Sequence, residues 1–228
     1  EAVAETDGGT LALLHSRNLV EIRVDQLALH QTLADFARQQ ADMTAAQQRH
    51  FDFYLALANE DRHNWRRIET AYSQIVWAWQ QAAEEEALIK FVGALQLFQK
   101  RRGLWSDFLT WATRGLALTR KIGLRHAEGK LLNNIASVHD NLGQRDRALE
   151  YYNQALSISE EVGDRVGLVA ILNNIGLVYD NLGQRDTALA YYNQALPIRE
   201  EVGDRAGLAT TLTNIGLVYY NLGQRNKA

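Results

Sequence analysis

Residues 172–183 read LNNIGLVYDNLG, and closely similar segments occur forty residues earlier and forty residues later. The earlier copy is LNNIASVHDNLG at 132–143, and the later copy is LTNIGLVYYNLG at 212–223. A second segment, YYNQAL, starts at Tyr151 and again at Tyr191, with the same offset. About two-thirds of the positions match between the first two full copies. A gapless period of this length predicts a solenoid of stacked repeats.

Each repeat contains two amphipathic stretches, which predict two helices. In the second repeat, apolar residues recur every three or four positions over 168–182 and again over 188–202, the spacing of one helix face. Gly183 lies between the two stretches and is a typical helix stop. Gly143 and Gly223 hold the same place in the neighbouring repeats. Such short connections predict antiparallel helix pairs with these glycines at the turns.

Small and aromatic residues recur in a fixed order within the repeats. The second repeat has Gly176, Tyr179, Ala188, Tyr192 and Ala195, and the first has Ala136, His139, Ala148, Tyr152 and Ala155. This order resembles the tetratricopeptide repeat, in the 40-residue form of kinesin-light-chain-like members, with His139 in an aromatic position. The resemblance implies an all-α fold in which helix pairs form a right-handed superhelix.

The first forty residues have a different pattern. Residues 19–24 alternate apolar and charged side chains, which predicts a half-buried strand, and residues 27–30 predict a second short strand or a turn. Helices are expected on either side, over 10–16 and 31–40. The segments LLHSRNLV at 13–20 and LHQTLADFA at 29–37 resemble the end of the winged-helix segment in bacterial signal-transduction NTPases of the STAND (NB-ARC-like) class. In that family a histidine at the place of His30 lies near the nucleotide phosphates, although the rest of that site is missing here.

These patterns divide the chain into six segments. Residues 1–42 resemble the C-terminal piece of a winged-helix-like α+β domain, and 43–83 form a helical linker or degenerate helix pair. Residues 84–123 resemble a degenerate repeat, 124–163 and 164–203 are full repeats, and 204–228 form a truncated repeat with a first helix and turn.

An aromatic stripe lies within the second of these segments. Trp65, Ile68, Tyr72, Ile75 and Trp79 follow one another at spacings of three and four, which predicts one face of a helix. We interpret the stripe as core packing rather than as an aromatic ligand box.

Composition and charge exclude several classes of protein. The 228 residues carry a formal net charge of −3, whereas binders of nucleic acid or anionic membranes need a basic surface. Cysteine is absent, which excludes disulfides and thiolate metal sites and fits a reducing cytoplasm. No apolar run approaches the roughly 20 residues of a membrane span. We therefore expect a cytoplasmic protein with no membrane or nucleic-acid partner.

No arrangement of residues in the sequence predicts catalysis. Residues 123–131 come nearest to a phosphate-binding loop, but the spacing is one residue too long and Leu131 replaces the Ser or Thr that binds magnesium. No two histidines have the i, i+4 spacing of a helical zinc site. The acidic pairs at 160–161 and 200–201 predict solvated faces, with Arg165 and Arg205 as candidate partners. We expect no enzymatic activity, no metal and no cofactor.

The candidate binding residues are polar side chains that recur forty residues apart. Asparagine is a mediocre helix former, so an interaction should offset its cost. The resemblance implies that the first helices line a concave face, where Asn134, Asn174 and Asn214 match a ladder that grips a peptide backbone. An amide suits this role because it donates and accepts hydrogen bonds. The further candidates are Asn133, Asn173, Asp140, Asp180, Asn141, Asn181 and Asn221.

Three other interpretations of these asparagines stay open. The ladder amides could bond between repeats, and the row at Asn141, Asn181 and Asn221 could reflect the preference for asparagine at a helix end before glycine. Recent duplication could also explain any recurrence.

The sequence therefore predicts a non-enzymatic sensor or scaffold that binds a protein or peptide in a concave groove. The N-terminal resemblance implies that it is the C-terminal, ligand-sensing part of a STAND-type signalling NTPase. One alternative is a scaffold that self-associates by stacking its repeats end to end. Another is a DNA-binding regulator, because winged helices often bind DNA, although residues 10–40 have little basic character.

Overall fold

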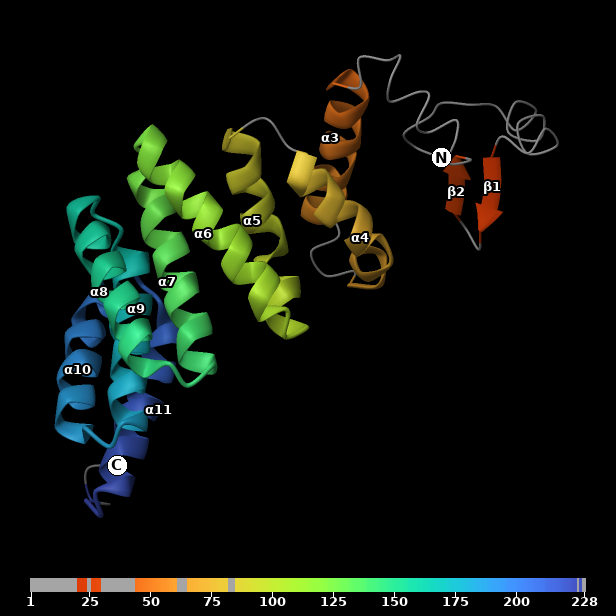
Figure 1. The fold of residues 1–228 in the computed structure, drawn as a ribbon. Coiled ribbons are helices and arrows are strands. Elements are labelled where there is room, and N and C mark those ends of the chain that lie inside the picture. The colour runs from red at the N-terminus through yellow and green to blue at the C-terminus, as the bar shows by residue number, and fades with distance from the viewer. Residues whose placement is uncertain are drawn as a thin grey trace. The chain divides into compact units, whose positions relative to one another are not determined.

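Helices make up most of the part of the chain that the structure describes. The computed structural model describes residues 20–23, 26–29, 44–60, 65–81, 85–224 and 226. The chain divides into two compact units, residues 1–98 and 99–228, with the boundary inside one helix (Figure 1). Each unit is described by itself below.

The first unit begins with a β-hairpin. Strands β1 (Val20–Arg23) and β2 (Gln26–Leu29) pair antiparallel, with Val20 opposite Leu29. The two strands predicted from the alternating pattern are therefore confirmed. The helices expected over 10–16 and 31–40, and His30, lie outside the described residues. A hairpin alone does not establish a winged-helix unit, so that assignment stays a prediction.

Three helices follow the hairpin in the described part of the first unit. Helices α3 (Thr44–Glu60) and α4 (Trp65–Gln81) pack together, and α5 (Glu85–Arg101) follows and continues into the second unit. Ile68, Ile75 and Trp79 of the aromatic stripe on α4 are buried, and the Tyr72 ring lies 5.4 Å from that of Phe98, centroid to centroid. The stripe is thus part of the core, as predicted.

The second unit repeats a helix and a short turn with nearly constant length. Its helices are α6 (Trp105–Ile122), α7 (Arg125–Asn141), α8 (Arg145–Glu161), α9 (Arg165–Asn181), α10 (Arg185–Glu201) and α11 (Arg205–Asn221). Each helix from α7 to α11 has 17 residues. Two such helices with their turns make one 40-residue repeat, so the predicted period is confirmed.

Glycines with left-handed backbone conformation end these helices. Gly143 has a φ of 73°, and its N–H donates to the carbonyl of Asp140, while the N–H of Gln144 donates to the carbonyl of His139. This pair of bonds satisfies carbonyls that a helix end leaves free, and the conformation favours glycine because it has no Cβ. Gly183 and Gly223 occupy equivalent turns, so the predicted turns inside helix pairs are confirmed.

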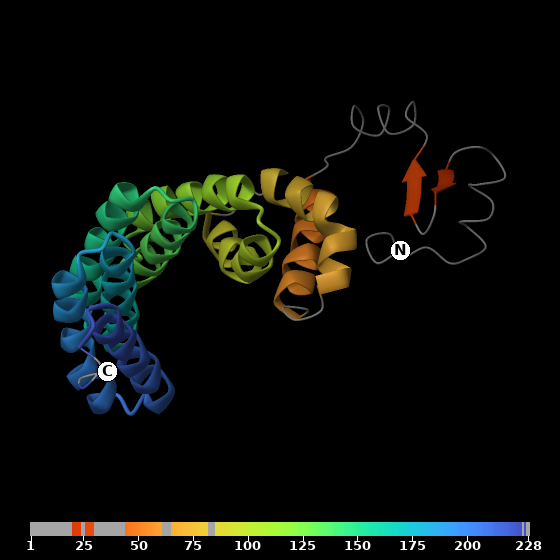
Figure 2. The same cartoon turned by 90° about the horizontal axis from the view of Figure 1, so that it is seen from below.

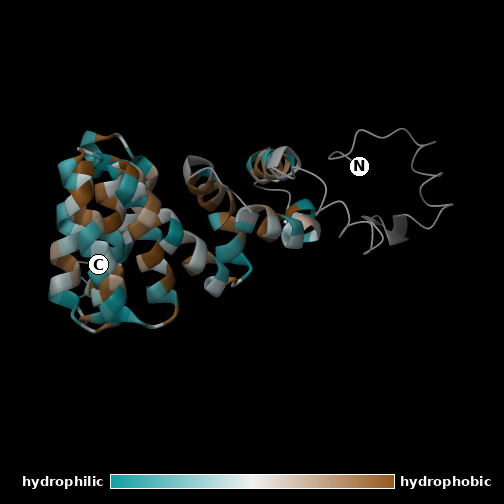
Figure 3. Ribbon diagram, turned by 45° about the horizontal axis from the view of Figure 1, so that its top comes forward, coloured by the Kyte–Doolittle hydropathy of each residue, from teal (hydrophilic) through white to brown (hydrophobic). Residues whose placement is uncertain are grey.

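The helix pairs are held together by small residues against large aromatic rings. A Cβ built on Gly176 would lie 2.6 Å from Cε1 of Tyr192, so the missing side chain lets this ring pack closely against α9. His139 stacks on Tyr151 with ring centroids 5.3 Å apart, and Tyr179 stacks on Tyr191 in the same way. His139 therefore acts as a packed aromatic substitute, as predicted. Figure 3 shows hydrophobic and hydrophilic residues side by side within each of these helices, as expected for helices with one buried face.

The helix pairs stack so that α7, α9 and α11 lie on one side of the second unit and α8 and α10 on the other. Within the second unit α7 packs on α8, α8 on α9 and α9 on α10 (Figures 1 and 2). In addition α7 contacts α9 and α9 contacts α11, whereas α8 and α10 share no comparable contact among the described residues. Helices that lie closer together form the inner side of a curved stack. The inner side of this unit is therefore lined by α7, α9 and α11.

Candidate functional site

Polar and apolar side chains form one stripe along the exposed face of each inner helix. Residues three, four and seven apart share a helix face, so positions 173, 174, 177 and 180 of α9 lie together. Equivalent positions occur on α7 and α11 because the offset of forty has no gaps. We call this surface the inner stripe: Asn133, Asn134, Ser137 and Asp140 on α7, Asn173, Asn174, Leu177 and Asp180 on α9, and Thr213, Asn214, Leu217 and Tyr220 on α11. All of these side chains are half-buried or exposed.

The asparagines of the inner stripe bond between repeats. Nδ2 of Asn174 donates to Oδ1 of Asn133 at 3.1 Å, and Nδ2 of Asn214 donates to Oδ1 of Asn173 at 3.2 Å. Thr211 donates to the same oxygen of Asn173 at 3.3 Å. The sequence left several interpretations of these asparagines open, and the structure supports the one in which their amides bond between repeats. Asn174 and Asn214 thus each pair with the neighbouring asparagine position of the preceding repeat.

These bonds leave part of each amide unused. A carboxamide has two N–H groups and an oxygen with two lone pairs. Asn174 uses one N–H and Asn173 uses its oxygen, so the Asn174 oxygen and the Asn173 N–H groups have no partner among the described residues. The paired amides thus offer one acceptor and at least one donor on neighbouring residues of the same face.

The first rung of the stripe has a different partner. Asn134 accepts a hydrogen bond from Nζ of Lys100 at 3.2 Å, and the same amine contacts Oγ of Ser137 at 3.5 Å. Forty residues before Asn133 the chain has Gly93, which has no side chain to pair with. Burial lowers the pKa of Lys100, which also lies over the ring of Phe108. The sequence reasoning missed this lysine, although it occupies the position of Asp140 and Asp180 one repeat earlier.

The two aspartates of the inner stripe lack direct partners. Asp140 and Asp180 are half-buried, and neither makes a hydrogen bond or an ion pair with another described residue. Burial raises the pKa of Asp140, and the charge of Arg145 acts in the opposite direction. A half-buried carboxylate without a partner is a group that a ligand could satisfy.

The second predicted row lies at the helix ends. Asn141, Asn181 and Asn221 are the last residues of α7, α9 and α11, and all three are exposed. Nδ2 of Asn141 donates to the backbone oxygen of Ser137 within the same helix at 2.7 Å. This local bond favours the helix-end interpretation for Asn141.

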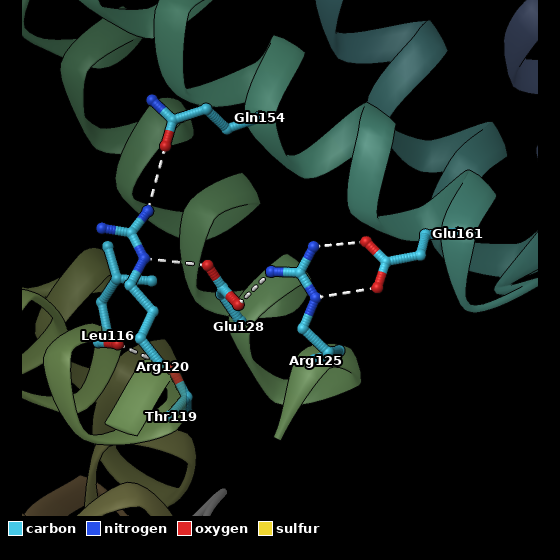
Figure 4. Close-up of polar contacts among 7 residues, drawn as sticks. All are labelled: Leu116, Thr119, Arg120, Arg125, Glu128, Gln154 and Glu161. Carbon is cyan, nitrogen blue, oxygen red and sulfur yellow. Dashed lines mark hydrogen bonds and ion pairs between the residues drawn. The ribbon is translucent and has the colours of Figure 1, made fainter. Parts of the chain in front are cut away.

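A network of charges joins the helices of the first repeat on the side of the turns. Arg125 pairs with Glu161 and also contacts Glu128, whose other oxygen accepts from Arg120 at 2.8 Å (Figure 4). The hydrogen bonds that Arg125 donates to Glu161 raise the pKa of Arg125 and lower the pKa of Glu161. Arg165 pairs with Glu201 in the next repeat. The expected pairing of the acidic pair at 160–161 with Arg165 is therefore wrong for Glu161, because the antiparallel helix pair brings Arg125 beside it.

A cavity of about 490 Å³ lies between α3 and α4 in the first unit. Its walls include Phe53, Tyr54, Arg66, Arg67 and Gln74. His50 bonds Gln74 through Nε2, and burial lowers the pKa of His50. The cavity is open and its arginines are exposed, so its lining does not indicate one class of ligand.

Two kinds of site are absent from the described part of the chain. Within it, no helix has the length and apolar character needed to cross a bilayer. The same residues contain no cluster of three or more His, Asp or Glu side chains suited to a metal ion.

Comparison with known families agrees with the repeat geometry. The family model described as tetratricopeptide repeat matches residues 127–201 and 167–228. Residues 127–228 are tetratricopeptide repeats. The comparison with curated protein sequences finds no match. The tetratricopeptide part of the predicted fold is thus established, whereas no comparison supports the winged-helix assignment of residues 1–42.

Solved structures similar to this chain are tetratricopeptide proteins of several kinds. A STAND protein with a tetratricopeptide repeat sensor from Pyrococcus horikoshii has a TM-score of 0.64 at 16% identity, over 86% of this chain and 31% of that one. A putative kinesin light chain with nearly identical TPR-like repeats from Podosopora anserina has a TM-score of 0.58 at 15% identity, over 76% and 87% of the chains. A Rap protein complexed with Competence and Sporulation Factor has a TM-score of 0.60 at 15% identity, over 86% and 55%.

At these identities the likeness extends to the fold only. The present chain spans less than a third of the STAND protein and about half of the Rap protein.

Proposed function

We propose that the tetratricopeptide repeats bind an extended segment of a protein or peptide along the inner stripe, and that the chain acts as a non-enzymatic sensor or scaffold. The observation that carries the proposal is the pairing of Asn133 with Asn174 and of Asn173 with Asn214. Each bond holds an amide in place and leaves a donor and an acceptor for a ligand.

The geometry of these pairs suits a peptide backbone. A backbone unit presents one N–H and one C=O, and the unused oxygen of Asn174 and N–H groups of Asn173 can receive both. Because each amide is already fixed by its partner, binding loses less side-chain freedom than it would with free asparagines. The inter-repeat bonds and the peptide ladder are therefore compatible.

Similar folds support this type of partner. The Rap protein is complexed with Competence and Sporulation Factor, and the STAND protein is described as having a tetratricopeptide repeat sensor. By analogy, the repeats here would sense a ligand for a larger signalling NTPase, with residues 1–42 and 43–83 as the connection to it. This finer proposal depends on fold likeness and on the N-terminal sequence resemblance.

The test is a selection of binding peptides followed by substitution of the ladder. A random nonapeptide library displayed on phage would be selected on the purified chain, and the best peptides synthesised and titrated by calorimetry. Replacing Asn134, Asn174 and Asn214 with Ala should weaken binding by about 10- to 1,000-fold if each amide contributes about 0.5–1.5 kcal/mol.

The matched control replaces Asn141, Asn181 and Asn221, the helix-end row, and should leave the affinity within about twofold. Melting of both variants separates folding from binding, because the ladder variant also loses inter-repeat bonds. Failure to select any peptide, or equal affinity for the ladder variant, would refute the proposed function.

A further inference from the structure

Tyr192 on α10 has a buried hydroxyl without a hydrogen-bond partner. Its side chain is 0% exposed, and no described residue lies within hydrogen-bonding distance and geometry of its oxygen. Burial, and then the charge of Asp180, raises the pKa of Tyr192 to about 12. The charge of Asp180 thus acts on the hydroxyl, but the two groups share no hydrogen bond. Leaving a buried hydroxyl unpaired usually destabilises a protein.

The equivalent tyrosine of the first repeat is satisfied. The hydroxyl of Tyr152 bonds the side chain of Ser137 on α7. Forty residues later the serine is replaced by Leu177, which cannot accept a hydrogen bond. The second repeat thus keeps the tyrosine but lacks its partner.

The surroundings of this hydroxyl combine negative charge with exposed apolar surface. Asp180 is half-buried, and Arg185, the equivalent of the Arg145 that acts on Asp140, makes no ion pair with it. Leu177 and Leu217 are 39% and 54% exposed on the same inner stripe. A carboxylate, an unpaired hydroxyl oxygen and two leucines form a set that would accept a cation next to an aliphatic group.

We propose that Asp180 and the hydroxyl of Tyr192 hold a cationic group of the bound peptide, while a neighbouring aliphatic side chain of the peptide packs on Leu177 and Leu217. The cation donates hydrogen bonds to the carboxylate and to the tyrosine oxygen, and a rotamer change of Leu177 admits it. This inference rests on the proposed function, because the cation belongs to a peptide held along the inner stripe.

The cation has two sources, a Lys or Arg side chain or a free N-terminal ammonium. Peptides from the phage selection would be made with each Lys or Arg replaced by norleucine, and with or without N-terminal acetylation. Loss of about tenfold or more in affinity on one of these changes identifies the source, since a charge-assisted hydrogen bond is among the stronger ones.

Three variants test the residues that form the site. Asp180→Asn removes the charge, Tyr192→Phe removes the hydroxyl, and Leu177→Ser gives Tyr192 the partner that Ser137 gives Tyr152. Each should reduce the preference for the cationic peptide over its norleucine or acetylated form by about fivefold or more. Asp186→Asn, which changes an exposed carboxylate of α10 outside the inner stripe, should leave the preference unchanged.

The outcomes separate this inference from the proposed function. Selected peptides that bind the wild type but show no cation preference would overturn the cation site and leave the groove intact. A cation preference that survives Asp180→Asn would also overturn it. If no peptide can be selected, both the groove and the cation site are refuted.

Discussion

The repeats at 124–163 and 164–203 share one scaffold and differ on the surface that a partner would meet. Both bury a tyrosine, Tyr152 or Tyr192, and both end their helices at left-handed glycines. On the inner stripe, however, Ser137 in the first repeat becomes Leu177 in the second. The residues that recur every forty positions maintain the packing of the helices. A single residue that does not recur changes the hydrogen bonding on the inner face.

The largest effect is expected from removing the shared aromatic residue. Tyr152→Ala and Tyr192→Ala should each lower the free energy of unfolding by about 3–5 kcal/mol, because both rings are fully buried. Similar losses, measured by chemical denaturation, would support an equivalent scaffold in the two repeats. Leu177→Ala, at an exposed position, is the control and should cost less than about 1 kcal/mol. A loss of stability in only one of the two variants would show that the two repeats do not share an equivalent scaffold.

A smaller effect is expected at the contact between the second repeat and α11. There the buried Arg199 donates from Nε to Oγ1 of Thr211 at 2.8 Å, whereas the equivalent buried residues one repeat earlier are Ser159 and Ile171. Thr211→Val should cost about 1–3 kcal/mol, since it leaves a buried donor of Arg199 without its acceptor.

Ile171→Val is the matched substitution in the preceding contact and should cost only about 0.5–1.5 kcal/mol. Urea denaturation of both variants gives the comparison. If Thr211→Val proved as mild as Ile171→Val, the hydrogen bond of Arg199 would be irrelevant to stability.

Sequence reasoning predicted the features that depend on one repeat alone. The turn at Gly183 follows from a glycine between two amphipathic stretches, and the packing of His139 follows from its place in the order of aromatic residues. The strands β1 and β2 follow from alternation. In each case the local pattern and the packing demand the same conformation.

Features that depend on neighbouring helices could not be obtained in this way. Position 174 bonds position 133 rather than 134, and Glu161 meets Arg125 rather than Arg165, because helix crossing decides which side chains meet. Lys100 was missed because the degenerate repeat has lost the asparagines that would have marked it. The unpaired hydroxyl of Tyr192 becomes visible only once the position of Leu177 in space is known.

Removing only the tyrosine hydroxyls should distinguish the two repeats. Tyr152→Phe should cost about 1 kcal/mol, because it breaks the bond with Ser137. Tyr192→Phe should be neutral or stabilising, because its hydroxyl has no partner to lose. Thermal melts of both variants measure the difference, with the Tyr→Ala pair as the reference for complete loss of the ring. Equal costs would mean that the Tyr192 hydroxyl is satisfied in solution, for instance by water.

The smallest effect concerns pH, and it should have opposite signs at Asp140 and Asp204. Burial raises the pKa of Asp140, so between its unfolded and folded pKa values the folded chain binds more protons, and stability falls as pH rises through this window. The backbone N–H of Gly207, and then Arg199, lower the pKa of Asp204. The stability that Asp204 contributes is present above its unfolded pKa and is lost as pH falls through its folded pKa.

Asparagine at each position removes the charge while keeping the shape. At pH 7 Asp140→Asn should raise the melting temperature and Asp204→Asn should lower it. The Asp140 difference should shrink as the pH falls from its raised folded pKa towards about 4, the ordinary pKa of aspartate. The Asp204 difference should shrink only below about 4 and should persist to lower pH, because its folded pKa is the lower one. Melting temperatures of the two variants and the wild type, taken between about pH 2.5 and pH 7, measure this. The same sign for both variants at pH 7 would contradict the contrast between an unpaired carboxylate on the inner stripe and a paired one at a helix N-terminus.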